Sequence, residues 1–324
     1  MMPDDTVVSH SHISENAYHH IRPSGFVIKS FFAGGIAGMC AKSFTAPVDR
    51  LKILLQVQHR QYRSYGVFSG FVAIYKKEGI LGYYKGNTAM MARIFPYAAI
   101  QFMSYEQYKR LLRPYFDQNA HTSKLLAGSL TGITAVSFTY PLDMVRARMA
   151  FQVHEKRYIG IVHTLVSIPQ QEGGFLALYR GFSSTILGMI PYAGVAFYSY
   201  EVTKSFLMRT FPQWTCKPAI DGSGTVVLNI PANLVAGGMA GAISQTVSYP
   251  LDVARRHMQL ARMISEKARP LGVVATLSHV YRTSGVRGLY RGMTINFYRS
   301  VPQVAVSFSV YELLKQVLGI SKPL

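Results

Sequence analysis

The sequence predicts an all-α membrane protein with six transmembrane helices in three pseudo-symmetric repeats, each about 100 residues long. The pattern Pro-x-Asp-x-x-basic carries this prediction, because it occurs at Pro47, Pro141 and Pro250 with offsets of 94 and 109 residues. These offsets exceed the periods of solenoid repeats, so each repeat is expected to be a small helical module. Segments 26–48 and 228–251 are also apolar and rich in small residues, over roughly the 20 positions that span a bilayer core.

The positions around this pattern repeat as well. Two glycines precede each motif proline by 13 and 9 residues, a spacing that allows close helix packing in membranes. Downstream, an aromatic-basic-glycine run ends at a glycine that is followed ten residues later by another proline. Each repeat then closes with Tyr-Glu-x-x-Lys. The glycines are Gly86, Gly181 and Gly292, and the closing motifs begin at Tyr105, Tyr200 and Tyr311.

Each repeat is expected to contain a long helix, a short amphipathic helix and a second long helix. The first long helix covers 27–57 and bends at Pro47, since a proline in a helix interior removes a backbone hydrogen bond. Apolar residues between 67 and 75 recur at helical spacing, which predicts an amphipathic helix on the membrane surface. The second long helix covers 86–112. The same elements are expected at 123–151, 161–168 and 181–207 in the second repeat, and at 229–260, 271–282 and 292–318 in the third.

Polar segments bound the repeats. We expect a polar N-terminal tail at 1–25 and a loop insertion at 211–227, which is rich in Pro, Gly and Ser and accounts for the longer second offset. The tail has neither the apolar core of a secretory signal nor the Arg-rich pattern of a typical transit peptide. The repeats are placed at 26–115, 120–210 and 228–320.

Charge and composition narrow the function. The chain has 34 basic and 15 acidic residues, which indicates an anionic partner. Nucleic acid is disfavoured, because the basic residues are spread over all three repeats and no aromatic-basic RNA-reading motif is present. Anionic lipid and an anionic substrate explain the excess better. Two cysteines cannot form a disulfide framework, and the sequence has no metal-ligand spacing, phosphate-cradling loop or catalytic triad, so we expect no metal, no cofactor and no enzyme activity.

Six helices of alternating direction place the ends of the first, third and fifth on one face and the ends of the others on the opposite face. The ionisable groups of the two charged motifs therefore form two rings, one at each mouth. Charges inside a membrane need a partner or a water-filled cavity, so they are expected to pair around each ring. We call the first the proline-motif ring: Asp49, Lys52, Asp143, Arg146, Asp252 and Arg255. The second is the Tyr-Glu ring: Glu106, Lys109, Glu201, Lys204, Glu312 and Lys315.

The substrate site is expected where the repeats differ, because a substrate is asymmetric and the scaffold is not. Seven residues after the motif glycine stand Arg93, Gly188 and Arg299, and Lys42 is the only cation five residues before a motif proline. Three unpaired cations suit a polyphosphate, since guanidinium groups clamp phosphate oxygens. Opposite them, Gly188-Met189 and Tyr192 would leave an uncharged slot for a flat ring, unless Tyr192 serves only in lipid-side or interhelical packing.

Over nearly its whole length the chain resembles the mitochondrial carrier family. This resemblance implies a multi-pass transporter of the inner mitochondrial membrane that acts as a monomer by alternating access, with the short helices on the matrix side. It implies a matrix gate with the pairs Asp49–Arg146, Asp143–Arg255 and Asp252–Lys52, braced by Gln56 and Gln259, whereas the second repeat departs from the pattern with Ala150. It also implies a cytoplasmic gate with the pairs Glu106–Lys204, Glu201–Lys315 and Glu312–Lys109 and the tyrosines Tyr105, Tyr200 and Tyr311.

The family's second motif, acidic-Gly-x-x-x-x-aromatic-basic-Gly, is intact only in the first repeat, where it ends at Gly86. The second copy has one extra residue and the third has Ser284 in place of the acid. In relatives these helix N-termini hold cardiolipin, and Gly86, Gly181 and Gly292 are the corresponding positions. For the two altered copies, a simple helix start is the alternative.

Within the family, the chain resembles the branch that carries coenzyme A and adenine nucleotides. The resemblance implies exchange of coenzyme A or a related adenine-bearing phosphorylated metabolite. Adenine nucleotides, adenosine bisphosphates and thiamine pyrophosphate also combine phosphates with a flat ring, so they stay open as substrates. A membrane scaffold or an uncoupler-like channel is the alternative of another class, although neither needs Lys42, Arg93 and Arg299 together.

Overall fold

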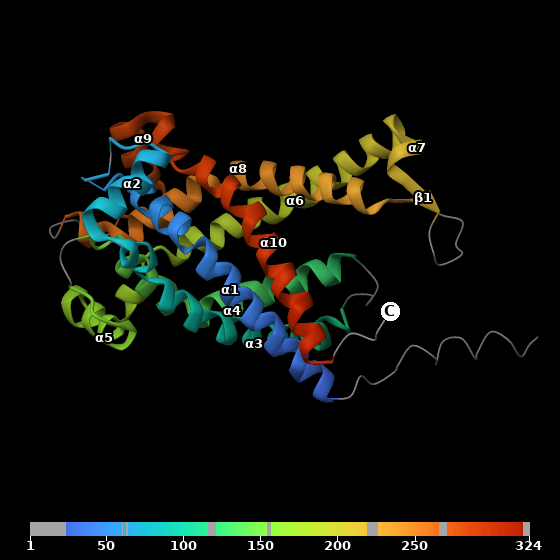
Figure 1. Ribbon diagram of the computed structural model, residues 1–324, viewed down its shortest axis with the longest axis horizontal. Coiled ribbons are helices and arrows are strands. Elements are labelled where there is room, and N and C mark those ends of the chain that lie inside the picture. Colours follow the sequence, from blue (N-terminus) through green and yellow to red (C-terminus); the bar gives the residue numbers. More distant parts are fainter. Residues whose placement is uncertain are drawn as a thin grey trace, which may run out of the picture.

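The computed structural model describes residues 24–59, 61–62, 64–115, 121–153, 157–218, 226–265 and 271–319. Almost all of the expected N-terminal tail therefore lies outside the described residues. The body consists of long helices at the positions that the sequence predicts (Figure 1). They are α1 (Ser24–Gln56), α3 (Asn87–Leu112), α4 (His121–Phe151), α6 (Phe182–Thr210), α8 (Ile230–Ile264) and α10 (Met293–Val317).

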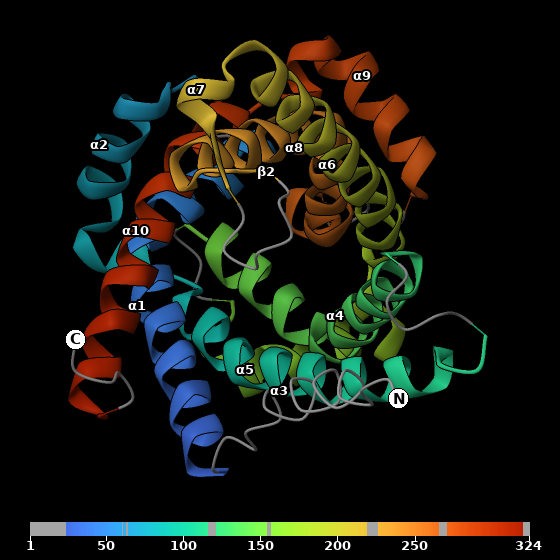
Figure 2. The same cartoon turned by 90° about the vertical axis from the view of Figure 1, so that its right-hand side faces the viewer.

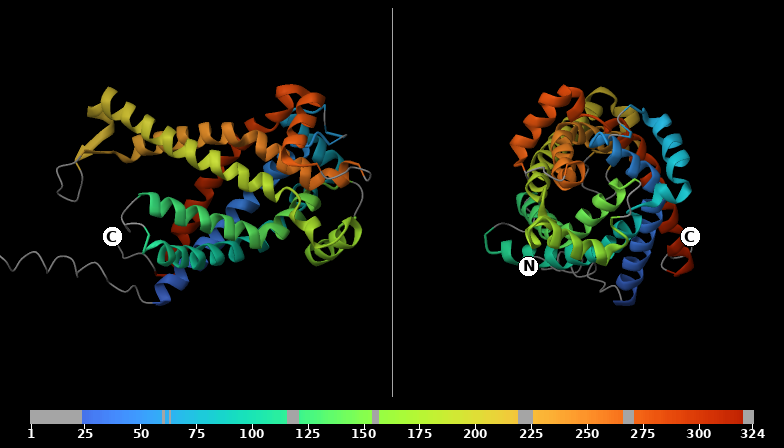
Figure 3. Two further views of the ribbon diagram at one scale, coloured as in Figure 1. Left: turned by 180° about the vertical axis from the view of Figure 1, so that it is seen from behind. Right: turned by 90° about the vertical axis from the view of Figure 1, so that its left-hand side faces the viewer.

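Each repeat also contains the expected short helix. These are α2 (Val67–Glu78), α5 (Ile161–Glu172) and α9 (Val273–Leu289), and the first two are followed by single 3-10 turns, η2 (Ile80–Tyr84) and η3 (Phe175–Tyr179). The short helices gather at one end of the bundle, as two opposite views show (Figures 1 and 3).

The long helices form a ring when the bundle is seen end-on (Figure 2). The second long helix of each repeat packs along the first long helix of the next: α3 on α4, α6 on α8 and α10 on α1. The three repeats therefore close into one body through three such contacts, which we call seam 1/2, seam 2/3 and seam 3/1. The motif prolines Pro47, Pro141 and Pro250 lie inside α1, α4 and α8, and each helix continues past its proline.

The insertion between the second and third repeats is not the plain loop that its composition predicts. It forms a short helix, α7 (Pro212–Thr215), and two antiparallel strands of three residues each, β1 (Cys216–Pro218) and β2 (Val226–Leu228), while the body of the chain is α-helical as predicted. Pro212 suits the first position of a helix, where its missing N–H costs nothing. Cys216 then pairs with Leu228, which brings the two ends of the insertion together.

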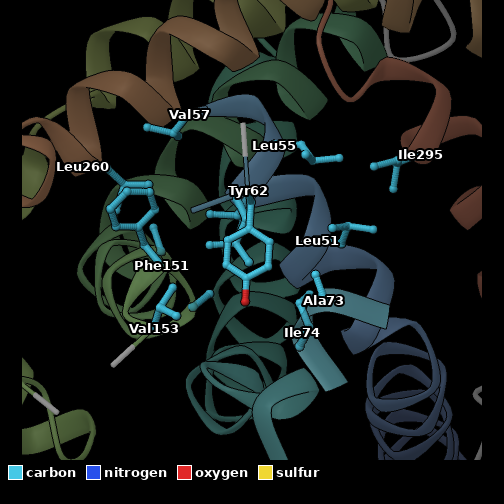
Figure 4. Packing of buried hydrophobic residues seen from close by; sticks show 14 residues of the cluster. Leu51, Leu55, Val57, Tyr62, Ala73, Ile74, Phe151, Val153, Leu260 and Ile295 are labelled. Atoms are coloured by element: carbon cyan, nitrogen blue, oxygen red, sulfur yellow. The ribbon is translucent and has the colours of Figure 1, made fainter. Parts of the chain in front are cut away.

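An apolar cluster at the end with the short helices joins the three repeats (Figure 4). Leu51 of α1, Ile74 of α2 and Phe151 of α4 pack with Leu260 of α8 and Ile295 of α10, and each is less than 5 % exposed. Burial of a large apolar side chain contributes about 1.5–3 kcal/mol, so this cluster fixes the seams where the proline-motif ring lies.

Large apolar side chains such as Phe102, Phe138 and Val301 are exposed along the long helices. Across the described ranges, no helix combines the length and the mean hydropathy of a membrane-crossing segment.

Candidate functional site

The proline-motif ring is largely closed. Arg146 of α4 contacts Asp49 of α1 at 2.6 Å, and Arg255 of α8 contacts Asp143 of α4 at 2.6 Å. Both aspartates are more than nine-tenths buried, so each needs a charged partner to offset its lost hydration. These two contacts are the ones that the sequence predicts, and they join α4 to α1 and α8 to α4.

The third expected pair, between Lys52 and Asp252, is absent from the structure. Lys52 Nζ instead donates to Asn296 Oδ1 at 2.9 Å and lies 5.4 Å from the centre of the Tyr249 ring. Asp252 accepts a hydrogen bond from Gln245 Nε2 at 3.1 Å. Each charge thus finds a neutral partner nearby, and this side of the ring is held without a direct ion pair.

The expected glutamine braces contact tyrosines as well as the ring. Gln259 Nε2 donates to the Tyr140 hydroxyl at 3.1 Å and to Asp143 Oδ2 at 2.9 Å. Gln56 Nε2 donates only to the Tyr249 hydroxyl, at 3.0 Å. Each tyrosine in turn donates to a backbone carbonyl of its own repeat, Tyr140 to Arg180 and Tyr249 to Arg291. The role of these tyrosines was not predicted from the sequence, although both directly precede a motif proline.

Seam 1/2 lacks both the glutamine and the tyrosine of this brace. Ala150 occupies the glutamine position and Ala46, before Pro47, occupies the tyrosine position. Both alanines line a small cavity of about 10 Å³, which is at the lower limit of the space that one water molecule needs. In seam 1/2 alanine therefore replaces both partners of the brace, the glutamine at Ala150 and the tyrosine at Ala46.

Two cations expected to be unpaired are held by the ring. Arg93 of α3 contacts Asp143 at 2.9 Å, and Arg299 of α10 contacts Asp49 at 2.6 Å. Each of these aspartates therefore contacts one arginine of the ring and one arginine of the candidate substrate site, and Asp143 also contacts Arg256 of α8 at 3.5 Å. The expectation of free cations is wrong for this state, because a buried guanidinium without a substrate takes the nearest carboxylate.

The uncharged slot lies in a cavity of about 880 Å³ between α4, α6 and α8. Gly188, Met189 and Tyr192 all line it, and a Cβ at Gly188 would only reach ordinary contact with Leu251, at 3.6 Å. Arg93, Arg299 and Lys42 are not among the described residues that line this cavity. Lys42 instead donates to Gln303 at 3.0 Å, so the structure separates the slot from the three cations.

The Tyr-Glu ring is open. Lys204 contacts Glu201 at 3.8 Å and Lys315 contacts Glu312 at 3.0 Å, in each case three residues away on its own helix. The expected pairs between repeats are absent from the part of the chain that the structure describes. All four side chains are more than a quarter exposed, so these ions stay hydrated.

The other residues of this ring also remain apart. Glu106 and Lys109 form no ion pair with any described residue. The Tyr200 hydroxyl contacts Asn233 Oδ1, at 2.5 Å, and Tyr311 lies beside Lys315 of its own helix. For Tyr105 the structure gives no contact with the ring. One mouth of the bundle is thus closed by charges while the other is open.

The motif glycines Gly86, Gly181 and Gly292 begin α3, α6 and α10 in the left-handed backbone conformation, with φ of +84°, +88° and +85°. A Cβ at Gly86 would lie 2.8 Å from the carbonyl oxygen of Arg146, and one at Gly181 would lie 3.0 Å from the carbonyl oxygen of Arg255. These positions require glycine because of both backbone conformation and packing across the seams. Backbone conformation and packing explain why each repeat has glycine at this position, so its presence in all three repeats is not by itself evidence of a bound ligand.

Buried ion pairs link the short helices to the long ones in two repeats. Glu78 contacts Arg50 at 2.8 Å, and Glu172 contacts Arg148 at 2.6 Å. In the third repeat Ser284 accepts a hydrogen bond from Gln58 at 2.8 Å. The altered third motif therefore contributes a neutral contact across seam 3/1.

This arrangement of three repeats is that of a known protein family. The model of the mitochondrial carrier protein family matches residues 24–116, 117–211 and 227–322. The chain belongs to the mitochondrial carrier family. It is a transporter of the inner mitochondrial membrane with multiple passes, and not an enzyme.

Curated relatives of this carrier cover most of its length. Solute carrier family 25 member 16 of Bos taurus is 52 % identical over 291 residues, which are 89 % of this chain and 88 % of the relative. The protein of the same name from Homo sapiens is 50 % identical over 291 residues, with the same shares. The mitochondrial coenzyme A transporter SLC25A42 of Rattus norvegicus is 40 % identical over 297 residues, which are 90 % of this chain and 88 % of the relative.

Proposed function

We propose that this carrier exchanges coenzyme A, or a related adenine-bearing phosphorylated metabolite, by alternating access. The observation that carries the proposal is that Asp49 and Asp143 each hold a second arginine, Arg299 and Arg93 respectively. The relative named as a coenzyme A transporter supports the choice of substrate. Adenine nucleotides, adenosine bisphosphates and thiamine pyrophosphate are the alternatives.

Phosphate groups would compete with the ring for these arginines. Phosphate oxygens accept paired hydrogen bonds from a guanidinium group, as carboxylates do. A bound polyphosphate would therefore draw Arg93 and Arg299 away from Asp143 and Asp49, and Lys42 would supply a third cation. Asp49 would then keep only Arg146, and Asp143 would keep Arg255 and Arg256, so part of the substrate's binding free energy would weaken the closed ring.

The two rings serve as gates in this proposal. The proline-motif ring is the matrix gate and is closed here, and the Tyr-Glu ring is the cytoplasmic gate and is open. When the substrate opens the first gate, Glu106, Glu201 and Glu312 would pair with the lysines of neighbouring repeats. A scaffold without transport would have no use for two charged rings of which only one is closed between repeats.

The membrane supplies a second anionic partner. We propose that Gly86, Gly181 and Gly292 hold cardiolipin phosphates at the helix N-termini that they begin, where free N–H groups and the helix dipole favour an anion. The three repeats of one chain close into one body, so the monomer is the proposed functional unit.

The site is tested by ligand-dependent thermal stabilisation of the purified carrier with coenzyme A and dephospho-coenzyme A. Replacing Arg299 or Arg93 with Ala removes a charge-assisted contact worth about 1.5–3 kcal/mol, so affinity should fall about ten- to hundred-fold. The loss should be greater for coenzyme A, which carries the extra phosphate. Gly188→Arg should abolish stabilisation by both ligands, because its side chain would fill the slot.

The comparison is made on the stabilisation that each ligand adds, since Arg299→Ala also removes an ion pair from the unliganded carrier. Arg287→Ala, on the exposed side of α9, is the matched control and should bind like the original protein. Full stabilisation in both Arg299→Ala and Gly188→Arg would refute this site.

A further inference from the structure

The cavity between α4, α6 and α8 is longer than a ring slot requires. Along α6 it extends from Thr185 to Phe197, about 18 Å at the rise of a helix. At one end lies Arg255 of the proline-motif ring, and at the other end lies Lys124 near the start of α4. A volume of about 880 Å³ is near the upper end for sites that enclose a whole ligand of several linked groups.

Between its charged ends the wall is neutral. The described charged residues in this wall are Lys124, Asp252 and Arg255, which all lie near the ends. The neutral part is formed by Gly128, Ser129 and Ile133 of α4 and by Ile186, Ile190, Ala193, Gly194 and Phe197 of α6. We call this part the α4/α6 trough. It is unsuited to phosphate groups and suited to an uncharged chain.

The trough is open because two of its positions have no side chain. A Cβ added at Gly128 or at Gly194 would meet no atom within 4 Å. Neither glycine has the positive φ that would require glycine for backbone reasons. Their small size therefore leaves space inside the carrier and is not needed for packing.

A neutral polar group in the wall also lacks a protein partner. Ser248 of α8 lines the cavity and is 5 % exposed, and its hydroxyl has no hydrogen-bond partner in the structure. A buried hydroxyl left unpaired costs about 1–3 kcal/mol, which a ligand with an amide or hydroxyl group would recover.

The cavity that contains the trough reaches the proline-motif ring at Arg255. Arg255 lines the cavity and shares Asp143 with Arg93, at 2.6 Å and 2.9 Å. A ligand with a phosphate near Arg255 and its flat ring against Gly188 would occupy this cavity and still leave the trough beside the ring empty. An adenine nucleotide would leave the trough unfilled.

We propose that the α4/α6 trough is a subsite for a long, uncharged, amide-bearing arm of the substrate, directed toward Lys124. This inference rests on the proposed function, because it assigns a further part of the same ligand. It selects a metabolite with such an arm over nucleotides that have the same phosphates and ring.

Two ligands that differ in the arm test the subsite. Dephospho-coenzyme A is ADP with the arm attached, so the ratio of the two dissociation constants measures what the arm contributes. We expect the carrier to bind dephospho-coenzyme A at least about tenfold more tightly than ADP, the gain from one or two buried contacts. Gly128→Leu and Gly194→Leu should lower this ratio to about one and leave ADP affinity within about twofold.

Gly237→Leu is the matched control. Gly237 is an exposed helical glycine of α8 where an added Cβ would also meet no atom within 4 Å, but it does not line the cavity. This variant should keep the tenfold ratio. Leucine favours helix over glycine, so all three variants should retain their helices.

Equal affinities of the original carrier for ADP and dephospho-coenzyme A would overturn the subsite and leave the proposed function standing. A tenfold ratio of the two dissociation constants that persists in both Gly128→Leu and Gly194→Leu would also overturn the subsite. If added phospholipid displaces dephospho-coenzyme A from the original carrier but not from Gly194→Leu, the trough holds a lipid chain and the inference is wrong. Absence of binding by both ligands would instead refute the proposed function itself.

Discussion

The two glutamine braces should contribute unequally to stability. Gln259 Nε2 donates to Asp143 and to the Tyr140 hydroxyl, and its Oε1 accepts from Arg256 at 2.7 Å. Gln56 makes one hydrogen bond, to Tyr249, and its Oε1 is buried without a partner. Replacing each glutamine with Met keeps the length of the side chain and removes these contacts.

The structure sets the size of each effect. Hydrogen bonds to charged groups contribute about 1.5–3 kcal/mol and neutral ones about 0.5–1.5 kcal/mol. Gln259→Met loses two of the first kind and one of the second, so we expect a loss of about 3.5–7.5 kcal/mol. Gln56→Met loses one neutral bond and removes an unpaired oxygen, so its cost should be at most about 1.5 kcal/mol.

Thermal unfolding of the purified carrier in detergent measures the difference. One kcal/mol corresponds to roughly 2–4 °C in a protein of this size class, so Gln259→Met should have a Tm at least about 4 °C below that of Gln56→Met. Tyr198→Phe serves as control, because that side chain is 73 % exposed and should leave the Tm unchanged. Equal losses for the two glutamines, or a larger loss for Gln56→Met, would refute this assignment of contacts.

Two further predictions concern the open ring and the seams. Glu201→Lys should impair transport and adding Lys315→Glu should restore part of it, since the proposed pair is then reversed; a double variant no better than the worse single variant in a transport assay would disprove the pairing. Gly181→Ala should lower the Tm, because a Cβ would strain a residue at φ +88° and lie 3.0 Å from the Tyr140 hydroxyl, whereas Gly237→Ala should not; equal Tm values would contradict this packing.

The helices could be predicted from the sequence because their signals are local. The interval 27–57 corresponds to α1 (Ser24–Gln56), and 86–112 corresponds to α3 (Asn87–Leu112). Prolines, glycines and apolar periodicity act within a few residues, so their meaning does not depend on the rest of the fold. The strands of the insertion were missed, since three-residue strands are too short to produce a pattern.

The contacts of the site needed the structure. Alternation of six helices predicts which charges share a ring, but not which of several arginines lies nearest to each aspartate. Arg299 and Asp49 are 250 residues apart in sequence, and nothing local to either indicates their contact. The same is true of Tyr140 and Gln259, although the shared replacement by Ala46 and Ala150 in one seam is a signal that could have been found.

Counter-exchange in cardiolipin-containing liposomes tests the central claim most directly. The purified carrier is reconstituted, the vesicles are preloaded with coenzyme A, ADP, adenosine bisphosphate or thiamine pyrophosphate, and uptake of labelled coenzyme A is followed. Uptake should be fastest with coenzyme A inside, slow in empty vesicles, and strongly reduced for Arg299→Ala. Folded carrier that takes up no coenzyme A under any of these conditions, while it exchanges one of the other ligands, would contradict the proposed substrate.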